Sequence, residues 1–203
     1  SDLVLVGSSP TPGTKLKKVA VPWLIVALSF LLGCIPTAYI AGRLSRSRDI
    51  RQLGDGNMGA QNAFRELGAK IGVAVGIVDA SKGALAILIA LEANTHQVVI
   101  LLAGSAVVIG HNWPVFLGFR GGRGESTTVG VLLLLVTQPM LLVSVVAAAV
   151  LIKTGNVIKA SAALFIPLPL VCWWLGVSGL LIAYSIGLPC LVGFTHFLRT
   201  KRK

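Results

Sequence analysis

Acidic residues are scarce in this chain. Only 7 of its 203 residues are Asp or Glu, whereas 18 are Lys or Arg, and the formal net charge is +11. Charged residues of both signs make up 12% of the sequence, 55% is hydrophobic and the mean hydropathy is +0.85, whereas a soluble domain carries about 25% charged residues. Such a chain cannot cover a folded surface with polar side chains, so the composition indicates an integral membrane protein.

Cysteine is also sparse. Cys34, Cys172 and Cys190 are odd in number, widely spaced and embedded in apolar runs, which excludes a disulfide framework and a metal-binding spacing. We therefore expect no metal and no cofactor. The sequence also lacks a Ser-His-Asp order and a His-x₄-Asp acyltransferase box, so any catalysis has to rely on positioning and electrostatic stabilisation.

The positive charges have two common causes in a membrane protein, namely loops that face anionic lipid and sites for anionic substrates. No basic helix and no basic patch with interleaved aromatic residues stands on a soluble module, so we expect membrane lipid and no nucleic acid among the partners.

Apolar runs of helical length follow a polar N-terminal stretch. Residues 1–18 are predicted to be a flexible tail rather than a signal peptide, because the next run is too long for a signal-peptide core and lacks a clear cleavage site. Residues 19–203 then form a single transmembrane domain, an all-α bundle of about seven spanning helices. Several runs are short, so six spans remain an alternative. The predicted spans cover residues 19–42, 70–91, 96–110, 125–137, 139–152, 160–176 and 179–195.

Lys and Arg fall in alternate connections between these spans. They occur after the first, third, fifth and seventh runs, whereas the connections around residues 92–95, 138–139 and 176–178 contain none. By the positive-inside rule, the basic loops and the C-terminus lie in the cytoplasm and the N-terminus lies outside.

The first polar loop, residues 54–65, combines three glycines with amides and a terminal arginine. Glycine lets the backbone present N–H groups to an anion, an amide can bond a hydroxyl, and arginine matches phosphate bidentately. A flexible turn between helices is the alternative. The candidate site residues are Gly54, Asp55, Gly56, Asn57, Gly59, Asn62 and Arg65.

The second polar loop, residues 110–128, places two arginines among glycines and runs into hydroxyl residues at the start of a helix. The N-terminal dipole of that helix favours an anion, although the pattern is not that of a nucleotide-binding P-loop. The alternative is a basic turn that only obeys topology. The candidate substrate-binding residues here are His111, Asn112, Arg120, Gly121, Gly122, Arg123, Gly124 and Thr127.

Asp79 and Lys82 are three residues apart inside an apolar run, so they can pair on one helix face. Because charges inside a membrane are costly, a functional role is the first hypothesis and a structural ion pair is the alternative. Lys82 is accordingly placed among the substrate-binding residues. His196, at the end of the last run, is either an interfacial residue or a catalytic one.

In the order and spacing of these motifs the chain resembles the acyl-phosphate-dependent glycerol-3-phosphate acyltransferases of bacteria, the PlsY family. The similarity covers roughly residues 20–197 and rests on four segments. These are residues 33–43, 54–65, 79–83 and 110–124.

This resemblance implies a compact seven-helix enzyme of the bacterial cytoplasmic (inner) membrane with its active site toward the cytoplasm. It would transfer an acyl group from acyl phosphate to the 1-hydroxyl of sn-glycerol 3-phosphate, giving lysophosphatidic acid and phosphate for phospholipid biosynthesis, as a monomer. The catalytic residues implied are Asn57, Asn62, Arg65, Arg123 and His196, and Ser161 joins the substrate-binding set.

The chain departs from the family pattern at several positions. Asp55 replaces a serine, Gln61 replaces a threonine, and Arg120 and Arg123 replace lysines. Arg199 stands where the family has an asparagine after the C-terminal histidine. A carboxylate beside a phosphate is unfavourable unless an arginine neutralises it. Two alternatives to an active acyltransferase therefore remain. The first is a divergent relative that binds phosphorylated lipid precursors with low turnover, and the second, less favoured one is a small membrane transporter.

Overall fold

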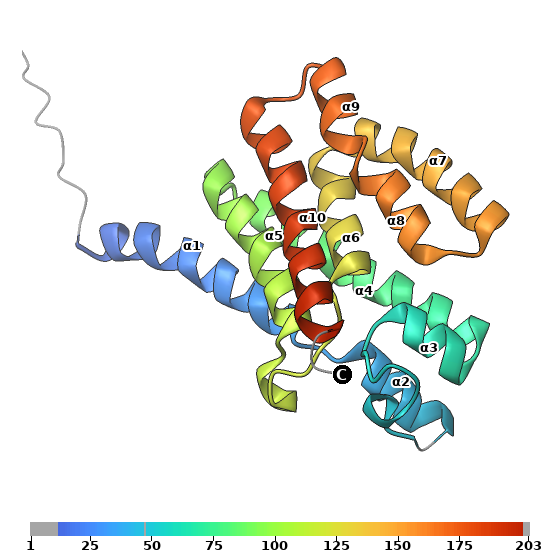
Figure 1. Ribbon diagram of the computed structural model, residues 1–203. Helices are drawn as coiled ribbons and strands as arrows, with labels where there is room; N and C mark the ends of the chain where they lie inside the picture. Colours follow the sequence, from blue (N-terminus) through green and yellow to red (C-terminus); the bar gives the residue numbers. More distant parts are fainter. Residues whose placement is uncertain (1–11, 47, 201–203) are drawn as a thin grey trace, which may run out of the picture.

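The computed structural model describes residues 12–46 and 48–200, and every regular element in this part of the chain is helical (Figure 1). The all-α prediction is therefore confirmed. The helices are α1 (Pro12–Gly33), α2 (Thr37–Arg46), α3 (Ala60–Leu67), α4 (Ala69–Glu92), α5 (Gln97–Asn112), α6 (Glu125–Leu135), α7 (Thr137–Thr154), α8 (Val157–Phe165), α9 (Leu168–Trp174) and α10 (Gly179–Thr200), with the short 3₁₀ turns η1 (Ile50–Gln52) and η2 (Val115–Leu117).

Within residues 12–46 and 48–200, six stretches are long and apolar enough to cross a membrane. They are Val21–Ser45, Ala69–Glu92, Gln97–Leu117, Thr137–Thr154, Val157–Trp174 and Gly179–Arg199. The predicted span over residues 125–137 corresponds to α6, which has 11 residues and rises only about 16 Å, roughly half of the hydrocarbon thickness. The predicted tail overlaps α1, which begins at Pro12, and its residues 1–11 lie outside the described part.

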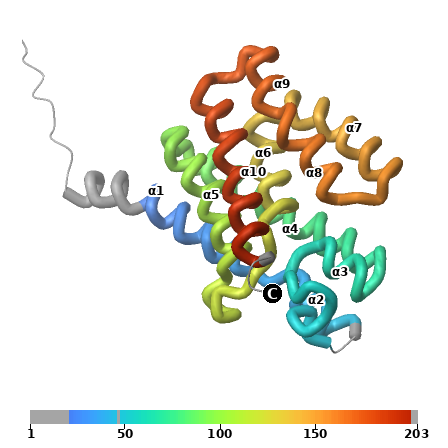
Figure 2. Tube along the Cα trace, in the orientation of Figure 1, coloured from blue at the N-terminus to red at the C-terminus, as the bar shows by residue number. Residues whose placement is uncertain are grey.

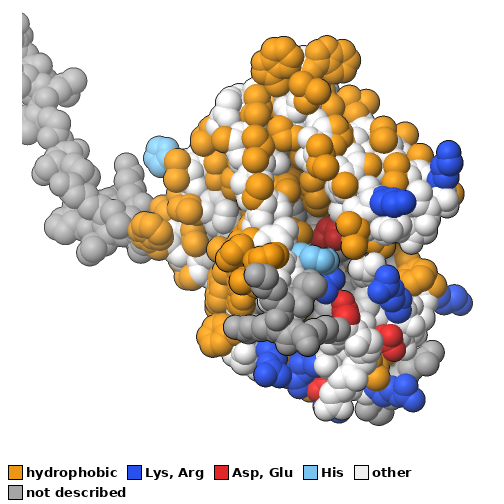
Figure 3. All heavy atoms as spheres, viewed as in Figure 1, with side chains coloured by type: hydrophobic (Ala, Val, Ile, Leu, Met, Phe, Trp, Pro, Cys, Tyr) orange, Lys and Arg blue, Asp and Glu red, His pale blue; other side chains and the backbone are white. Residues whose placement is uncertain are grey.

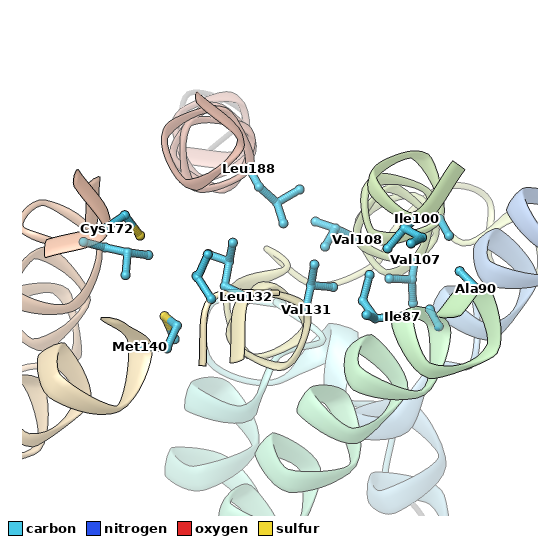
Figure 4. Close-up of a cluster of buried hydrophobic side chains, with 14 of the residues drawn as sticks. Ile87, Ala90, Ile100, Val107, Val108, Val131, Leu132, Met140, Cys172 and Leu188 are labelled. Carbon is cyan, nitrogen blue, oxygen red and sulfur yellow. The ribbon is translucent and has the colours of Figure 1, made fainter. Parts of the chain in front are cut away.

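Helix α6 is nevertheless the centre of the packing. Figure 4 shows Val131 and Leu132 of α6 between α4 and α5 on one side and α7, α9 and α10 on the other. The tube in Figure 2 follows the same arrangement, with α1 against α5 and α7 beside α8. Other members of this core include Ile87, Val107, Val108, Met140, Cys172 and Leu188.

Glycines bring two pairs of helices into backbone contact. A Cβ atom on Gly130 of α6 would lie 1.9 Å from the carbonyl oxygen of Ala80 on α4, and one on Gly83 of α4 would lie 2.2 Å from that of Thr127 on α6. Gly33 of α1 and Gly110 of α5 meet in the same way, with a Cβ on Gly33 only 2.1 Å from the Val107 carbonyl oxygen. Lipid provides no hydrophobic driving force for helix association, so close van der Waals packing at small residues stabilises such crossings instead.

The first spanning stretch is broken between α1 and α2, at residues 34–36, where Pro36 ends the regular hydrogen bonding. The break leaves backbone carbonyls without helical partners. The Lys82 ammonium, from α4, donates to the carbonyl oxygens of Gly33 at 3.1 Å and Ile35 at 3.0 Å. Its third partner is the Asp79 carboxylate at 2.9 Å. Three donors thus meet three acceptors, and this buried lysine ties α4 to the break.

Charged side chains gather at one end of the molecule. In Figure 3 most Lys and Arg lie around α2, α3 and the nearby loops, with two more near α7 and α8, whereas the opposite end shows many hydrophobic side chains and no Lys or Arg on the face in view. Exposed apolar side chains such as Trp173 (69%) and Trp174 (73%) belong to that end, as expected of a surface that faces lipid.

The close glycine contacts predict a position-specific response to alanine. Gly130→Ala should lower the free energy of unfolding by about 1–3 kcal/mol, because a methyl group cannot fit against Ala80. Gly187→Ala on α10 is the matched control, since a Cβ there meets nothing within 4 Å among the described atoms. Thermal unfolding in detergent micelles measures both, and equal midpoints for the two variants would contradict the packing argument.

Candidate active site

A cavity of about 280 Å³ lies where the loop before α3, the helix α4, the loop before α6 and the helix α10 come together. Its wall combines polar groups from segments far apart in the sequence with glycines of α4. The residues that line it are Asn57, Gly59, Ala60, Gln61, Gly72, Val73, Gly76, Asp79, His111, Arg123, Gly124, Glu125, Ser126, Val157, Ile158, Val192 and His196.

The structure therefore brings together several of the predicted site residues. Asn57, Gly59, His111, Arg123, Gly124 and His196 all line the cavity. Asp55 stands behind this wall and contacts Arg123, with 2.9 Å between Oδ2 and Nη2. The two polar loops, nearly seventy positions apart, meet through this ion pair.

The loop before α3 is organised by Asn62. The Asn62 side-chain amide donates to the carbonyl oxygens of Leu53 and Asn57, both at 3.0 Å, and its oxygen accepts from the Asp55 N–H at 3.3 Å. Asn62 is buried and does not line the cavity. Its hydrogen-bonding groups are occupied by the loop backbone, so the structure shows Asn62 organising the loop, and its catalytic role stays a prediction.

Two glycines in this loop have left-handed backbones, Gly54 at φ +53° and Gly56 at φ +69°. A Cβ on Gly54 would also lie 2.4 Å from Asn62 Oδ1, so glycine is needed to let the loop close over that amide. At the base of the loop, Asp49 accepts from Arg51, with 2.7 Å between the Arg51 Nη2 and Asp49 Oδ2 atoms. The Arg51 guanidinium lowers the pKa of the Asp49 carboxyl to about 2. Gly54 and Gly56 shape the loop and do not line the cavity.

The glycine-rich loop before α6 is packed against the end of α5. Gly121 N–H donates to the Asn112 carbonyl oxygen at 3.2 Å and Gly122 N–H to that of His111 at 3.0 Å. A Cβ on Gly122 would lie 1.9 Å from His111 Nε2. Gly121 and Gly122 were expected to hold phosphate, but their described contacts are to α5, and only Gly124 of these three lines the cavity.

Arg199 of α10 takes part in the same packing, since its guanidinium donates to the carbonyl oxygens of Gly121 and Asn112. Asn112 also donates through its side-chain amide to the Thr195 hydroxyl at 3.0 Å. The arginine that replaces the family's asparagine thus ties the last helix to the glycine loop.

The other predicted residues lie outside the cavity. Arg65 and Arg120 are exposed, Thr127 is buried against α4, and Lys82 is committed to the helix break. These geometries do not support the expected direct contact of these side chains with substrate in the cavity. Ser161 also lies outside it and lines a neighbouring groove instead.

That groove, between α8, α9 and α10, has a volume of about 680 Å³ and is mainly apolar. It shares Glu125, Ile158, Val192 and His196 with the polar cavity, so the two spaces are adjacent. The Ser161 hydroxyl donates to the Glu125 carboxyl at this junction. The other groove residues include Ala162, Phe165, Ile166, Pro169, Ile186, Pro189 and Cys190.

Two polar atoms of cavity residues are buried without a hydrogen-bond partner in the described part of the chain. They are Arg123 Nε, a donor, and Asn57 Oδ1, an acceptor. A buried polar group left unpaired is costly, so these atoms are the natural contacts for a ligand that carries both an anionic oxygen and a hydroxyl.

The family model described as glycerol-3-phosphate acyltransferase matches residues 23–202. The chain belongs to this family. "Glycerol-3-phosphate acyltransferase 4" of Dehalococcoides mccartyi is 54% identical over 181 residues, 89% of this chain and 98% of that protein. A glycerol-3-phosphate acyltransferase of Thermoanaerobacter pseudethanolicus is 38% identical over 184 residues, 88% of this chain and 90% of that protein.

A solved structure is similar over nearly the whole domain. The crystal structure of PlsY (YgiH), an integral membrane glycerol 3-phosphate acyltransferase, in its glycerol 3-phosphate form, has a TM-score of 0.77 and 30% sequence identity to this chain. The match covers 89% of this chain and 90% of that one. Its lysophosphatidic acid form matches with a TM-score of 0.76. The family resemblance read from the sequence motifs is thereby confirmed.

Sequence reasoning missed two carboxylates of the cavity wall. Asp79 was singled out as a charge within an apolar run but was not among the predicted site residues, although its carboxylate lies 3.5 Å from His111 Nδ1 and accepts from the Thr37 hydroxyl at 2.9 Å. Glu125 was quoted within the second loop without a role. An acidic residue within an apolar stretch was the available signal for Asp79.

Lys82 provides a test of the helix break. Lys82→Met should lower the free energy of unfolding by about 3–5 kcal/mol, because it leaves Asp79 buried without its lysine partner and removes the donor to Gly33 and Ile35. Adding Asp79→Asn should recover part of this loss. Additive effects of the two substitutions in thermal unfolding would contradict the assigned pairing.

Asn62 and Asn57 should separate stability from activity. Asn62→Ala should lower the unfolding midpoint and increase hydrogen exchange over residues 50–62, since it removes the amide that joins the loop backbone. Asn57→Ala should leave the midpoint within a few degrees and reduce turnover. A lower unfolding midpoint for Asn57→Ala, with Asn62→Ala as stable as the wild type, would contradict the hydrogen bonding assigned to this loop.

Proposed function

We propose that this chain transfers an acyl group from acyl phosphate to the 1-hydroxyl of sn-glycerol 3-phosphate, giving lysophosphatidic acid and phosphate. The observation that carries the proposal is that a polar cavity lined by Arg123 lies next to an apolar groove and shares part of its wall with it. An amphiphilic donor and a small phosphorylated acceptor need these two environments side by side. Family membership and the activity named for the relatives support the same reaction.

The groove suits the acyl tail. Its wall is mainly apolar, and α8, α9 and α10 supply most of its residues. With the tail in this groove and the phosphate in the cavity, the reactive carbonyl carbon lies near the shared residues Glu125 and His196.

The cavity suits the phosphate groups. Arg123 lines it with an unpaired Nε–H, and the N-terminus of α6 begins at Glu125 beside Gly124. An arginine and a helix N-terminus together provide charge-assisted donors and a favourable dipole for phosphate oxygens. The free oxygen of Asn57 can accept from a hydroxyl of the glycerol moiety.

The chemistry then needs little beyond positioning. The acceptor hydroxyl oxygen attacks the carbonyl carbon, the bond from that carbon to the phosphate oxygen breaks, and phosphate leaves with the electron pair. The hydroxyl proton passes to a phosphate oxygen, as the family resemblance suggests. Because an acyl phosphate is already activated, the protein contributes orientation and stabilisation of the developing charge rather than a strong nucleophile.

The proposal includes a multi-pass location in the bacterial inner membrane with the cavity toward the cytoplasm. The basic loops and the charged end seen in Figure 3 support this orientation, and the cavity is formed by residues of those same loops.

One copy of the chain forms both cavity and groove, which supports a monomer. About six or seven crossings follow, depending on whether the short helix α6 is counted.

A low-turnover relative is the second candidate, favoured by the Asp55–Arg123 contact. The two candidates differ in the product formed by the wild-type chain. The decisive assay supplies acyl phosphate and glycerol 3-phosphate to the protein in lipid nanodiscs and measures phosphate release and lysophosphatidate together. Lysophosphatidate at background level from the folded wild-type chain would overturn the proposed function.

Arg123→Ala should reduce kcat/KM by about 10²–10³, the typical effect of removing one preorganised donor from a developing charge. Arg48→Ala is the control, because this arginine is exposed in the loop after α2 and outside the cavity. Equal turnover by Arg123→Ala and the wild type would exclude the role assigned to the guanidinium.

A further inference from the structure

Asp55 makes an unusual contact for a residue beside an anion site. Its carboxylate lies 2.9 Å from Arg123 Nη2, and the two side chains are 28% and 19% exposed. Arg123 lines the cavity whereas Asp55 does not. The carboxylate thus approaches the guanidinium from behind the cavity wall and occupies one of its donors.

Arg123 is the one Arg or Lys among the described residues that line the cavity, and Asp79 and Glu125 line the same space. The Arg123 guanidinium is therefore the main group that can compensate the charge of a phosphate in this cavity, beside the N-terminus of α6. Asp55 neutralises the same group, and the Asn57 N–H holds its other oxygen at 3.1 Å.

We propose that the Asp55 carboxylate is an intramolecular competitor for phosphate at Arg123, and so a determinant of how tightly this site binds phosphorylated ligands. Substrate phosphate has to share or displace this contact. The same competition raises the rate at which product phosphate dissociates, so Asp55 lowers the affinity for phosphate and speeds its release. The inference rests on the proposed function only in taking phosphate as the ligand of the cavity.

A positioning role is the opposite possibility, in which Asp55 orients Arg123 and phosphate binding weakens without it. Two considerations favour competition. Arg123 is already confined, with less than a fifth of its side chain exposed, so orientation adds little. In contrast, Asp55 and a phosphate bound to Arg123 would be separated only by the guanidinium group. The two anions then repel each other strongly, because the site is partly desolvated and Coulomb interactions are strong there.

Asp55→Asn isolates the charge. The asparagine keeps an oxygen for the Asn57 N–H, has nearly the same volume, and presents an NH₂ group that cannot accept from Arg123. Asp55→Ser is the second variant and removes the carboxylate while keeping a small polar side chain. Glu92→Gln is the matched control for net charge, because Glu92 is exposed at the far end of α4.

The measurement is the affinity of inorganic phosphate for the full chain in nanodiscs, by isothermal titration calorimetry. Asp55→Asn and Asp55→Ser should lower Kd about tenfold, equivalent to about 1.4 kcal/mol, whereas Glu92→Gln should change it less than twofold. The KM for glycerol 3-phosphate should fall in the same two variants. Unfolding midpoints measured beside the titrations establish that each variant is folded.

Unchanged or weaker phosphate binding in the folded Asp55 variants overturns the competition, and weaker binding shows that Asp55 positions Arg123. A similar gain in Glu92→Gln also overturns it, since the effect would then belong to net charge. The outcome is separable from the proposed function. Tighter phosphate binding without any lysophosphatidate sinks the acyl transfer alone, whereas acyl transfer with unaltered phosphate binding sinks the competition alone.

Discussion

The Lys82 ammonium is the interaction on which the architecture depends. A membrane interior leaves no water for an interrupted helix, so the carbonyl groups exposed between α1 and α2 need donors from the protein. Lys82 supplies them to Gly33 and Ile35, and Asp79 balances its charge. One costly charge pair thus allows the chain to turn from α1 into α2 within a span instead of continuing straight.

The site follows from that turn. Asp79 holds the Thr37 hydroxyl at the start of α2 and faces His111 at the end of α5, so the break, the fourth helix and the fifth helix share one carboxylate. The loop after α2 is then closed by Asn62, and the glycine loop is pressed onto α5 by close backbone contacts. Many polar groups in both loops form hydrogen bonds within the loops or to α5. Arg123 and Asn57 keep unpaired atoms that a ligand can contact.

The charge balance of the cavity distinguishes this chain from a simple phosphate cradle. Arg123 faces a space that also contains Asp79 and Glu125, and Asp55 contacts the arginine from behind. Strong anion binding would call for several uncompensated cations. Under the proposed function, this balance suits release of phosphate as well as its binding, and the neighbouring groove offers a mainly apolar surface.

Much of this protein was readable from its sequence. The membrane location was predicted from the mean hydropathy and from the alternation of basic loops. These features depend only on composition and residue order, and a bilayer sorts residues by their transfer free energy. The same holds for the family, whose motifs are local strings of residues, and for the gathering of site residues in two loops.

Only the tertiary structure decided which of those residues face the cavity. Asn57 and Asn62 are both amides in one loop, yet one lines the cavity and the other binds the loop backbone. Arg120 and Arg123 are equivalent in a sequence motif, yet one is exposed and the other pairs with Asp55. A side chain's role depends on which backbone groups and distant charges compete for its hydrogen bonds. Those competitors come from other helices, so the competition is settled only when the helices pack.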